Sequence, residues 1–392
     1  MQEDLIMKKT DRNDGRKVLM IATCNFLTVH NDGGRQVSYN NYKLLCDIFG
    51  KENVLLCMIT NDEARDEQVI TMPTFHTRFE QVVYTLQGRN GYNKKTEKKI
   101  LKLIEDGNCE YIWFDRSTLG GLCRKVQSNA YKIVFFHNIE KKYICNKIRH
   151  EGIGYLTAYR AFAENEKKAI QYADALITLN ERDQKILMGE YGRTSDFILP
   201  VSFEDIYDEK KLINSPYKNS QGKRVLLFVG SFFEPNIQGI EWLISNVIPR
   251  LPNCILYIVG KGMEVKEKEW NSSNVQVVGS VKDLAPYYRY ADAVVLPIFY
   301  GDGMKVKTAE ALMYGKVIFG TKEAFEGYQI EKSEDMVLCE RAEEFCTKIE
   351  EYFSKGARET FSKSNRQYFL EYHQNATLKN KLEKFIFSRR EN

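Results

Sequence analysis

The chain has 392 residues, more than one hydrophobic core normally organises, and therefore predicts two domains. Its composition, 43% hydrophobic and 12% aromatic, excludes a disordered chain. The 57 basic and 53 acidic side chains leave a net charge of only +4, so we expect no nucleic-acid partner.

The N-terminal stretch and the cysteines indicate the compartment. Residues 1–15 are polar and lack the apolar core of a signal peptide. No apolar run reaches the roughly 18 residues that a membrane-spanning helix needs. The nine cysteines are scattered and form no CxxC pair, which is typical of reduced thiols in a protein core. We expect a cytoplasmic protein, either free or peripheral at the inner face of the membrane.

Apolar runs alternate with helical patterns through the first half of the chain. The runs are continuous, as in strands that are covered on both faces of a parallel sheet. Helical patterns between them include 37–49, 94–105 and 151–172. The strands that this alternation predicts span 17–23, 53–59, 111–114, 131–136, 173–179 and 196–201.

The alternation stops in a polar stretch at 207–224 and then restarts. The second half predicts strands at 224–230, 254–260, 274–279, 291–299 and 316–321, and a helical tail from 341 to 388. We therefore predict an α/β fold with two Rossmann-like, doubly wound parallel sheets facing a cleft. The predicted division is a first domain at 1–205, a linker at 206–222, a second domain at 223–360, and helices at 361–392 that return to the first domain.

A stretch rich in glycine and lysine, GDGMKVKTAEALMYGK at 301–316, follows a predicted strand and opens a helix. Backbone amides at Gly303 and Met304, at the positive end of a helix dipole, suit an anion such as a phosphate. Lys305 and Lys307 add positive charge where a helix alone disfavours it. A bound diphosphate would remove this conflict.

Glu310 lies one turn deeper in the same predicted helix. There a carboxylate can accept hydrogen bonds from the two hydroxyl groups of a ribose. The alternative interpretation is an ordinary helix, with Asp302 as its N-cap and a solvated ion pair between Lys307 and Glu310.

Two further strand ends in the first half carry candidate residues. Gly33 and Gly34 follow the first predicted strand and let a backbone approach a ligand closely, although a double glycine is more often a plain turn. The loop is not a GxGxxG dinucleotide fingerprint. His137 directly follows the strand at 131–136, at the ligand end of a parallel sheet, although a single histidine is more often structural.

The second half resembles the retaining GT-B glycosyltransferases of group 1, glycosyltransferase family 4. Asp302 and Glu310 have the spacing of the family's two acidic residues, although the first is usually Glu. The stretch GKVIFGT at 315–321 loosely matches the family's G-x-P-V-x-x-T, and FEG at 325–327 matches its Glu-Gly. Residues 226–262 resemble the first strand and helix of the donor domain. The resemblance covers the last two-thirds of the chain well and the first third weakly.

One departure concerns the donor phosphates. Many family members carry Arg and Lys just after the first strand of the donor domain, whereas this chain has Ser231 and Asn236 at the matching positions. Lys305 and Lys307 are the substitutes that we expect. The resemblance implies donor binding by Gly33, Gly34, Gly230, Ser231, Gly303, Met304, Lys305, Lys307, Thr308 and Glu310.

In the first half the resemblance is carried by a loop similar to the family's NxGG and by the sequence HNIE at 137–140. It implies an acceptor side formed by Asn31, Gln36, Asn138 and Glu166. It also implies that His137 contacts the transferred sugar, and that His137, Asp302 and Lys305 contribute to catalysis. We expect Asn180 and Asp183 to be structural, since they open the next helix.

A basic stretch at 88–102, with aromatic residues before it, suggests contact of residues 78–102 with anionic lipid. The alternative is a mixed amphipathic helix on the protein surface.

The resemblance implies transfer of a sugar from a UDP- or GDP-sugar to a glycan or lipid-linked acceptor, with retention of anomeric configuration. Polysaccharide, capsule or lipopolysaccharide-type synthesis is the expected setting. We expect no cofactor, since the nucleotide sugar is a substrate. We also expect no metal, because the five histidines have no ligand spacing. The alternatives are another GT-B enzyme, such as a nucleotide-sugar epimerase, and an inactive protein that binds nucleotide sugars.

Overall fold

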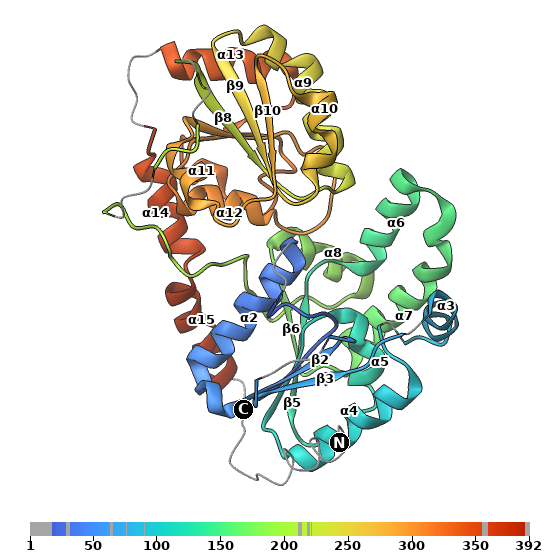
Figure 1. Cartoon of the computed structure of the whole chain (residues 1–392). Coiled ribbons are helices and arrows are strands. Elements are labelled where there is room, and N and C mark those ends of the chain that lie inside the picture. The colour runs from blue at the N-terminus through green and yellow to red at the C-terminus, as the bar shows by residue number, and fades with distance from the viewer. Residues whose placement is uncertain are drawn as a thin grey trace. The chain divides into compact units, whose positions relative to one another are not determined.

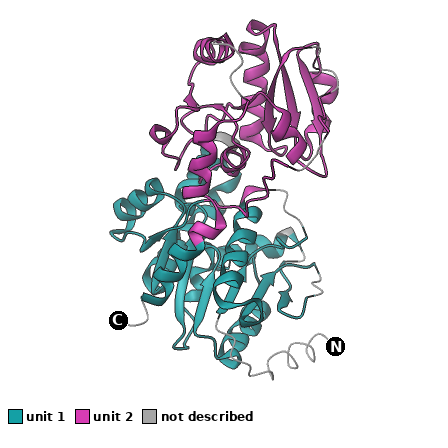
Figure 2. Ribbon diagram, turned by 90° about the vertical axis from the view of Figure 1, so that its left-hand side faces the viewer, with its two compact units in different colours: residues 1–30, 34–200, 379–392 teal, residues 31–33, 201–378 magenta. Residues whose placement is uncertain are grey.

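The computed structural model describes residues 18–28, 32–62, 66–75, 77–89, 91–210, 214–217, 220, 222–354 and 360–388. These residues form two compact units (Figure 2). The first unit consists of the described residues within 1–30, 34–200 and 379–392, and the second of those within 31–33 and 201–378.

The first unit is built on a parallel sheet of seven strands, in the order β3-β2-β1-β4-β5-β6-β7 (Figure 1). Because β1 pairs with both β2 and β4, the order of the strands reverses between β1 and β4. Ligands of open α/β sheets bind at such a switch point, at the carboxyl ends of the strands. The strands span Val18–Ala22 (β1), Val54–Ile59 (β2), Val69–Met72 (β3), Tyr111–Phe114 (β4), Tyr131–Phe136 (β5), Ala175–Thr178 (β6) and Phe197–Ile198 (β7).

The α-helices of the first unit connect these strands, and three of them begin at a side-chain cap. Thr77, Asn93 and Asn180 each accept a hydrogen bond from the backbone N–H three residues further on. The expected capping role of Asn180 is thereby confirmed. The helices span Gly33–Phe49 (α2), Arg78–Leu86 (α3), Lys94–Gly107 (α4), Gly120–Cys123 (α5), Glu140–Glu151 (α6), Leu156–Tyr172 (α7) and Glu181–Tyr191 (α8).

The second unit repeats this plan with six parallel strands, in the order β10-β9-β8-β11-β12-β13. Here the switch point lies between β8 and β11, since β8 pairs with both β9 and β11. The strands span Arg224–Val229 (β8), Cys254–Val259 (β9), Val275–Gly279 (β10), Ala293–Leu296 (β11), Ile318–Gly320 (β12) and Met336–Leu338 (β13). The helices span Glu234–Asn246 (α9), Glu267–Trp270 (α10), Ala285–Tyr290 (α11), Val306–Met313 (α12), Ala342–Ser354 (α13), Lys363–Tyr372 (α14) and Asn375–Ser388 (α15).

The apolar runs of the sequence form the interior strands of both sheets. Every residue of β1, β2 and β4 is buried, as is every residue of β9 and β11. Continuous burial is what a parallel sheet covered on both faces requires. The prediction of two doubly wound parallel sheets is confirmed.

The end of the chain returns to the first unit, as the sequence predicts. The Phe385 ring stacks on Phe197 with 4.8 Å between their centroids, and Phe387 packs edge-on against Phe49 at 5.5 Å. The last part of α15 therefore completes the first unit.

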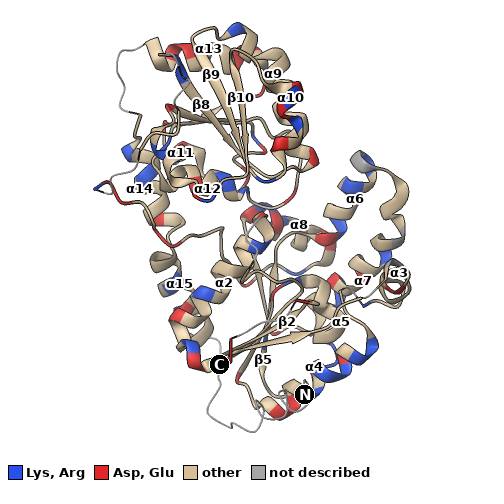
Figure 3. Cartoon of the chain, in the orientation of Figure 1, with Lys and Arg blue, Asp and Glu red and all other residues tan. Residues whose placement is uncertain are grey.

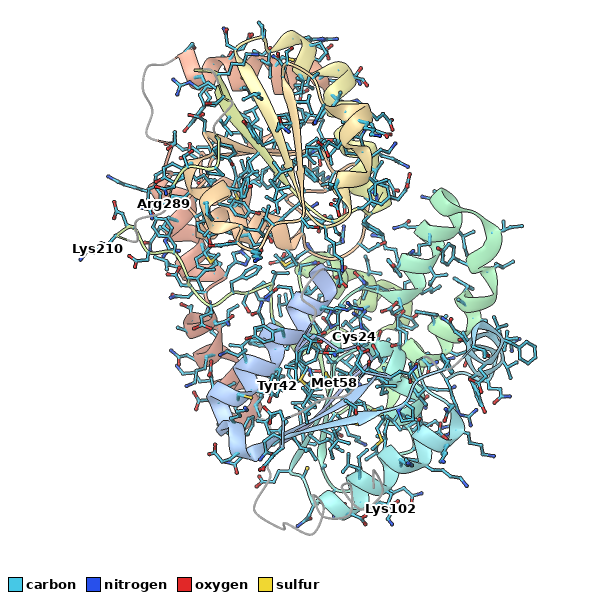
Figure 4. The ribbon with its side chains drawn as sticks, viewed as in Figure 1. Cys24, Tyr42, Met58, Lys102, Lys210 and Arg289 are labelled. Carbon is cyan, nitrogen blue, oxygen red and sulfur yellow. The ribbon has the colours of Figure 1, made fainter. Side chains whose placement is uncertain are left out.

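The described residues of the expected linker pack within the second unit. Arg289 of α11 donates hydrogen bonds to the backbone oxygens of Asp208, at 3.2 Å, and Glu209, at 2.5 Å. Figure 4 labels Arg289 and Lys210 on this side of the second unit. The Tyr217 hydroxyl donates to the Tyr287 oxygen at 2.6 Å. The boundaries that the sequence predicts for the two domains remain a proposal.

The elements differ from the expectation in two places. The helix predicted at 151–172 begins later, at Leu156, because Gly152 has a φ of 102°, which ends α6 at Glu151, and a short 3-10 turn at Ile153–Tyr155 precedes α7. The edge strands β3 and β13 were not predicted, since runs of four and three residues carry little periodic signal.

Candidate functional site

The candidate residues of the second unit lie on the loop between β11 and α12. Gly303 has a φ of 68°, a left-handed conformation that favours glycine, and it turns the chain into the helix. Lys305 is the N-cap of α12, and its backbone oxygen accepts a hydrogen bond from the Tyr328 hydroxyl at 2.7 Å. The Thr308 hydroxyl donates to the Ala324 oxygen at 2.7 Å, so this predicted donor-site residue anchors the helix in the structure.

The ammonium group of Lys307 is held near the carboxyl end of β8. It donates a hydrogen bond to Asn236 Oδ1 and lies 4.7 Å from the centroid of the Phe228 ring. Asn236 is fixed in turn, because its amide nitrogen donates to the Ser231 oxygen at 2.8 Å. A Cβ atom at Gly230 would lie 3.1 Å from the Lys307 ammonium and 2.9 Å from the Asn236 amide nitrogen. The absence of a side chain at Gly230 thus makes room for Lys307.

The surroundings of Lys307 contain no carboxylate in ion-pairing contact among the described residues. Burial, reinforced by the neighbouring charge of Lys305, lowers the pKa of Lys307 to about 7, and the more distant Glu310 only partly opposes this. An anion in contact with this ammonium group would supply the missing negative charge.

Lys305 does have a carboxylate partner. Its ammonium group lies 2.6 Å from Glu323 Oε1 and donates to the Gly303 oxygen at 3.0 Å. The two lysines of the motif therefore differ, since Lys305 is paired and Lys307 is held by an amide.

The carboxylate of Glu310 is half-buried on α12. The Tyr288 hydroxyl donates to its Oε2 at 3.2 Å, and the Tyr288 ring stacks on Tyr314 with 5.1 Å between centroids. Burial raises the pKa of Glu310 to about 7, although Tyr288 and Lys307 oppose the shift.

These contacts differ from the alternative interpretation of the sequence, an ordinary helix with Asp302 as N-cap and a solvated ion pair. The N-cap of α12 is Lys305 and not Asp302, which lies half-buried four residues before the helix begins. Lys307 and Glu310 bond to Asn236 and Tyr288 and form no solvated ion pair with each other. Met304 is buried beside them.

Other candidate residues lie at the start of α2 and directly after β5. Gly33 and Gly34 form the first turn of α2, and Gln36 is half-buried on that helix. Asn138 is half-buried directly after β5. Asn31 lies outside the described residues.

His137 is 4% exposed at the end of β5, and its Nε2 lies 3.2 Å from Asp115 Oδ2. Burial and the nearby Arg116 guanidinium lower the pKa of His137, although Asp115 opposes this shift. The net shift favours the neutral form of the imidazole.

Glu166 is enclosed in the interior of the first unit. Its two oxygens accept hydrogen bonds from the backbone N–H of Glu140 and from the Tyr191 hydroxyl, each at 2.5 Å. Burial raises the pKa of Glu166 to about 7. This placement favours a structural role in holding the start of α6, whereas the sequence suggested the acceptor side.

Sequence reasoning missed several residues that shape both sites. Asp115 carries a visible signal, because it directly follows the apolar run YIWF, where a parallel strand ends. Asn236 stands out in the sequence only as the residue that replaces a basic one. Tyr288 and Glu323 have no local signal, since the fold alone brings them to α12.

Two searches of the described residues bear on metal and membrane. They contain no group of three or more His, Cys, Asp or Glu side chains that could hold a metal ion. Among the described helices, none is long and apolar enough to cross a membrane.

Comparison with known proteins identifies the second unit. Residues 223–355 match the family model described as glycosyl transferases group 1. A search of curated proteins gives no match.

Solved structures resemble the whole chain. Sucrose-phosphate synthase from Thermosynechococcus elongatus has a TM-score of 0.71 and 14% identity, with 95% of this chain and 99% of that chain covered. Anabaena HepE in complex with UDP and glucose has a TM-score of 0.66 and 13% identity, covering 95% and 100%. WaaG, a glycosyltransferase involved in lipopolysaccharide biosynthesis, has a TM-score of 0.65 and 15% identity, covering 94% and 99%. At such identities the likeness shows the fold.

The likeness to these structures, together with the two parallel sheets, shows the GT-B fold. Within the second unit, residues 223–355 match the group 1 glycosyl transferases, the family that this half of the sequence resembles.

Proposed function

We propose that the chain transfers a sugar from a UDP- or GDP-sugar to a glycan or lipid-linked acceptor, and that its second unit binds the nucleotide diphosphate. The observation that carries this proposal is the setting of the Lys307 ammonium group. Its ammonium group is held at the carboxyl end of β8 by an amide oxygen, with its pKa lowered by burial and by Lys305. A lysine in this setting gains most from a bound anion.

The diphosphate would contact the loop that turns into α12. Backbone amides of Gly303 and Met304 lie at the start of the helix, where its dipole favours negative charge. Lys305 and Lys307 add two cations beside them. Because the leaving nucleotide gains negative charge as the glycosidic bond breaks, these groups stabilise the transition state more than the ground state.

Glu310 would bind the ribose. Its Oε2 accepts from Tyr288, which leaves further acceptor capacity on the carboxylate for two vicinal hydroxyl groups. We assign Asp302 and the segment Gly230–Ser231 to the donor sugar and its phosphates, respectively.

The first unit supplies His137, for which we propose a hydrogen bond to a hydroxyl group of the reacting sugar. Asn31, Gln36 and Asn138 are the proposed acceptor-side residues. The complex of HepE with UDP and glucose supports a hexose donor, and the involvement of WaaG in lipopolysaccharide biosynthesis supports a glycan or lipid-linked acceptor. We further propose retention of configuration and catalysis without a metal.

The experiment that tests the function is a donor screen. Wild-type protein and the Lys305→Ala/Lys307→Ala variant are titrated with UDP, GDP and their hexose derivatives, with melting temperature as the readout. We expect one nucleotide series to stabilise the wild type and the effect to vanish in the variant. Equal stabilisation of both proteins would contradict the assignment of the phosphate site.

Turnover assays with the selected donor then separate the alternatives. Transfer to an added glycan or lipid-linked acceptor, in the presence of a chelator, supports the proposal. Conversion of the donor sugar without acceptor would favour an epimerase. Binding without any turnover across the acceptor panel would favour an inactive sugar-nucleotide binding protein.

We also propose that residues 78–102 contact an anionic lipid surface. Phe79, Val82 and Leu86 lie on α3 at helical spacing and are 77%, 48% and 64% exposed. Five lysines lie along α4, where Figure 3 shows basic and acidic residues together, and Lys102 points outward from the helix in Figure 4.

A further inference from the structure

Asp115 is the centre of a buried hydrogen-bond network in the first unit. It directly follows β4 and is 1% exposed. Its Oδ1 accepts from the Asn41 amide at 3.1 Å and from the Trp113 indole at 3.2 Å. Its Oδ2 accepts from the Ser38 hydroxyl at 2.5 Å and lies 3.2 Å from His137 Nε2. One carboxylate thus joins α2, β4 and the end of β5.

The chemistry of these partners determines which atoms donate and which accept around Asp115. The Asn41 amide nitrogen and the Trp113 indole nitrogen can only donate, so both require Oδ1 to accept. Three hydrogen bonds, from the Asn41 amide, the Trp113 indole and the Ser38 hydroxyl, stabilise the charged form of this buried carboxylate. Asp115 is therefore an ionised group that accepts at both oxygens.

An ionised carboxylate dictates the tautomer of a neutral imidazole. Since Oδ2 can only accept, the proton of His137 must reside on Nε2. The other ring nitrogen, Nδ1, is then a hydrogen-bond acceptor. In this state Nδ1 can accept a hydrogen bond from a hydroxyl group, and it cannot itself donate to a carbonyl or carboxylate oxygen.

We propose that Asp115 is a positioning residue, which holds His137 in the Nε2-protonated tautomer so that Nδ1 accepts a hydrogen bond from a sugar hydroxyl. The inference rests on the proposed function, because it specifies how His137 recognises the sugar. The Ser38 oxygen also lies 3.1 Å from the Gly34 oxygen, so the same network reaches the glycine turn at the start of α2.

The variant Asp115→Asn tests this directly. Its carbonyl oxygen must replace Oδ1, because Asn41 and Trp113 both donate there. Its NH2 group then faces His137 Nε2 in place of Oδ2. A donor at this point favours the opposite tautomer, with the proton on Nδ1. The variant has nearly the same size and shape as the wild type, so the packing is preserved.

Nitrogen-15 NMR of histidine-labelled protein reads the tautomer without any substrate. His373 provides an internal reference for the opposite state, because its Nδ1 lies 2.7 Å from the Val201 carbonyl oxygen and must donate to it. The His137 signals are identified by their loss in His137→Gln. We expect an Nε2-protonated His137 in the wild type and an Nδ1-protonated His137 in Asp115→Asn. The wild-type tautomer in the variant would overturn the proposal.

Turnover completes the test. We expect kcat/KM for the nucleotide sugar to fall roughly 10- to 100-fold in Asp115→Asn, the cost of one mispaired buried hydrogen bond, with unchanged affinity for the free nucleotide diphosphate. Ser38→Ala leaves the Asp115 carboxylate and the His137 tautomer unchanged. We expect its kcat/KM to fall only about threefold, which corresponds to the net contribution of one hydrogen bond.

The outcomes distinguish failure of the positioning role of Asp115 from failure of the proposed function. A changed tautomer with unaltered turnover would overturn the positioning role while leaving the glycosyltransferase assignment intact. If the wild type turns over no nucleotide sugar, the proposed function fails, and the reaction role assigned to Asp115 fails with it, whatever the tautomer. An equal loss of activity in Ser38→Ala and Asp115→Asn would show general damage to the fold and would also overturn the inference.

Discussion

The Tyr288 hydroxyl donates a hydrogen bond to Glu310 Oε2 at 3.2 Å, so a side chain of α11 orients the carboxylate that we assign to the ribose. Glu310 is half-buried on α12, with its pKa raised by burial to about 7. A carboxylate held in this way offers acceptor oxygens in a fixed direction, which is what recognition of two vicinal hydroxyl groups requires.

Replacing Glu310 by Gln should separate ribose binding from phosphate binding. We expect the affinity for UDP or GDP to fall roughly 10- to 100-fold, because hydrogen bonds to a charged group are lost. Affinity for inorganic pyrophosphate should be unchanged or slightly higher, since a nearby negative charge is removed. Isothermal titration calorimetry measures both. Tyr288→Phe is the matched control, with a smaller expected loss for the nucleotides. Equal losses for pyrophosphate and nucleotide would contradict the ribose assignment.

Lys307 predicts a pH dependence of phosphate binding. Because its pKa is lowered to about 7, the free protein loses this positive charge as the pH rises above 7, and a bound diphosphate favours the protonated form. The affinity of the wild type for pyrophosphate should therefore fall, relative to Lys307→Arg, by up to about tenfold per pH unit above 7. Arginine stays protonated throughout this range.

The comparison with Lys307→Arg cancels the titration of pyrophosphate itself. Ionisation of Glu310 acts in the same direction, so the series is repeated in the Glu310→Gln background. Parallel pH profiles for lysine and arginine would show that Lys307 carries no phosphate charge.

The ion pair between Lys305 and Glu323 should compete with the phosphate. Their atoms lie 2.6 Å apart in the absence of ligand, so a diphosphate that contacts Lys305 must weaken this contact. In Glu323→Gln we expect the affinity for pyrophosphate to increase roughly two- to fivefold, which is the range expected for a partly exposed ion pair. Glu326→Gln is the control on the same loop. A decrease in affinity would instead indicate that Glu323 orients Lys305 for binding.

The exposed apolar face of α3 should support binding to lipid. We expect the wild type to sediment with vesicles that contain phosphatidylglycerol and to bind far less to vesicles of phosphatidylcholine alone. Phe79→Ser/Leu86→Ser should weaken binding to the anionic vesicles at constant charge. Lys94→Gln/Lys98→Gln should reduce the salt dependence of binding to the anionic vesicles. If none of these changes affects sedimentation, α3 and α4 are ordinary surface helices.

The fold could be predicted because its signals are local and repeated. Continuous apolar runs identify interior parallel strands, and the order of strands and helices identifies doubly wound sheets. The edge strands β3 and β13 were not predicted, since they are short and their residues pair on one side only. The later start of α7, after Gly152, was not predicted, because a positive φ is not visible in periodicity.

The sequence alone indicated the motif that we propose as the anion site. The glycines, the two lysines and Glu310 lie within one stretch of ten residues, where spacing along a helix decides which side chains share a face. The sequence also showed that Ser231 and Asn236 replace a basic pair.

Only the tertiary structure distinguished the two lysines and selected the partners of each charged group. Lys305 meets Glu323, Lys307 meets Asn236, and His137 meets Asp115, each across a sequence separation of 18 residues or more. Such pairs depend on which strand ends the fold brings together, and a hydrogen bond between distant residues leaves no spacing in the chain. Burial likewise depends on the whole fold, and for that reason the pKa values that shape this chemistry could not be read from the sequence.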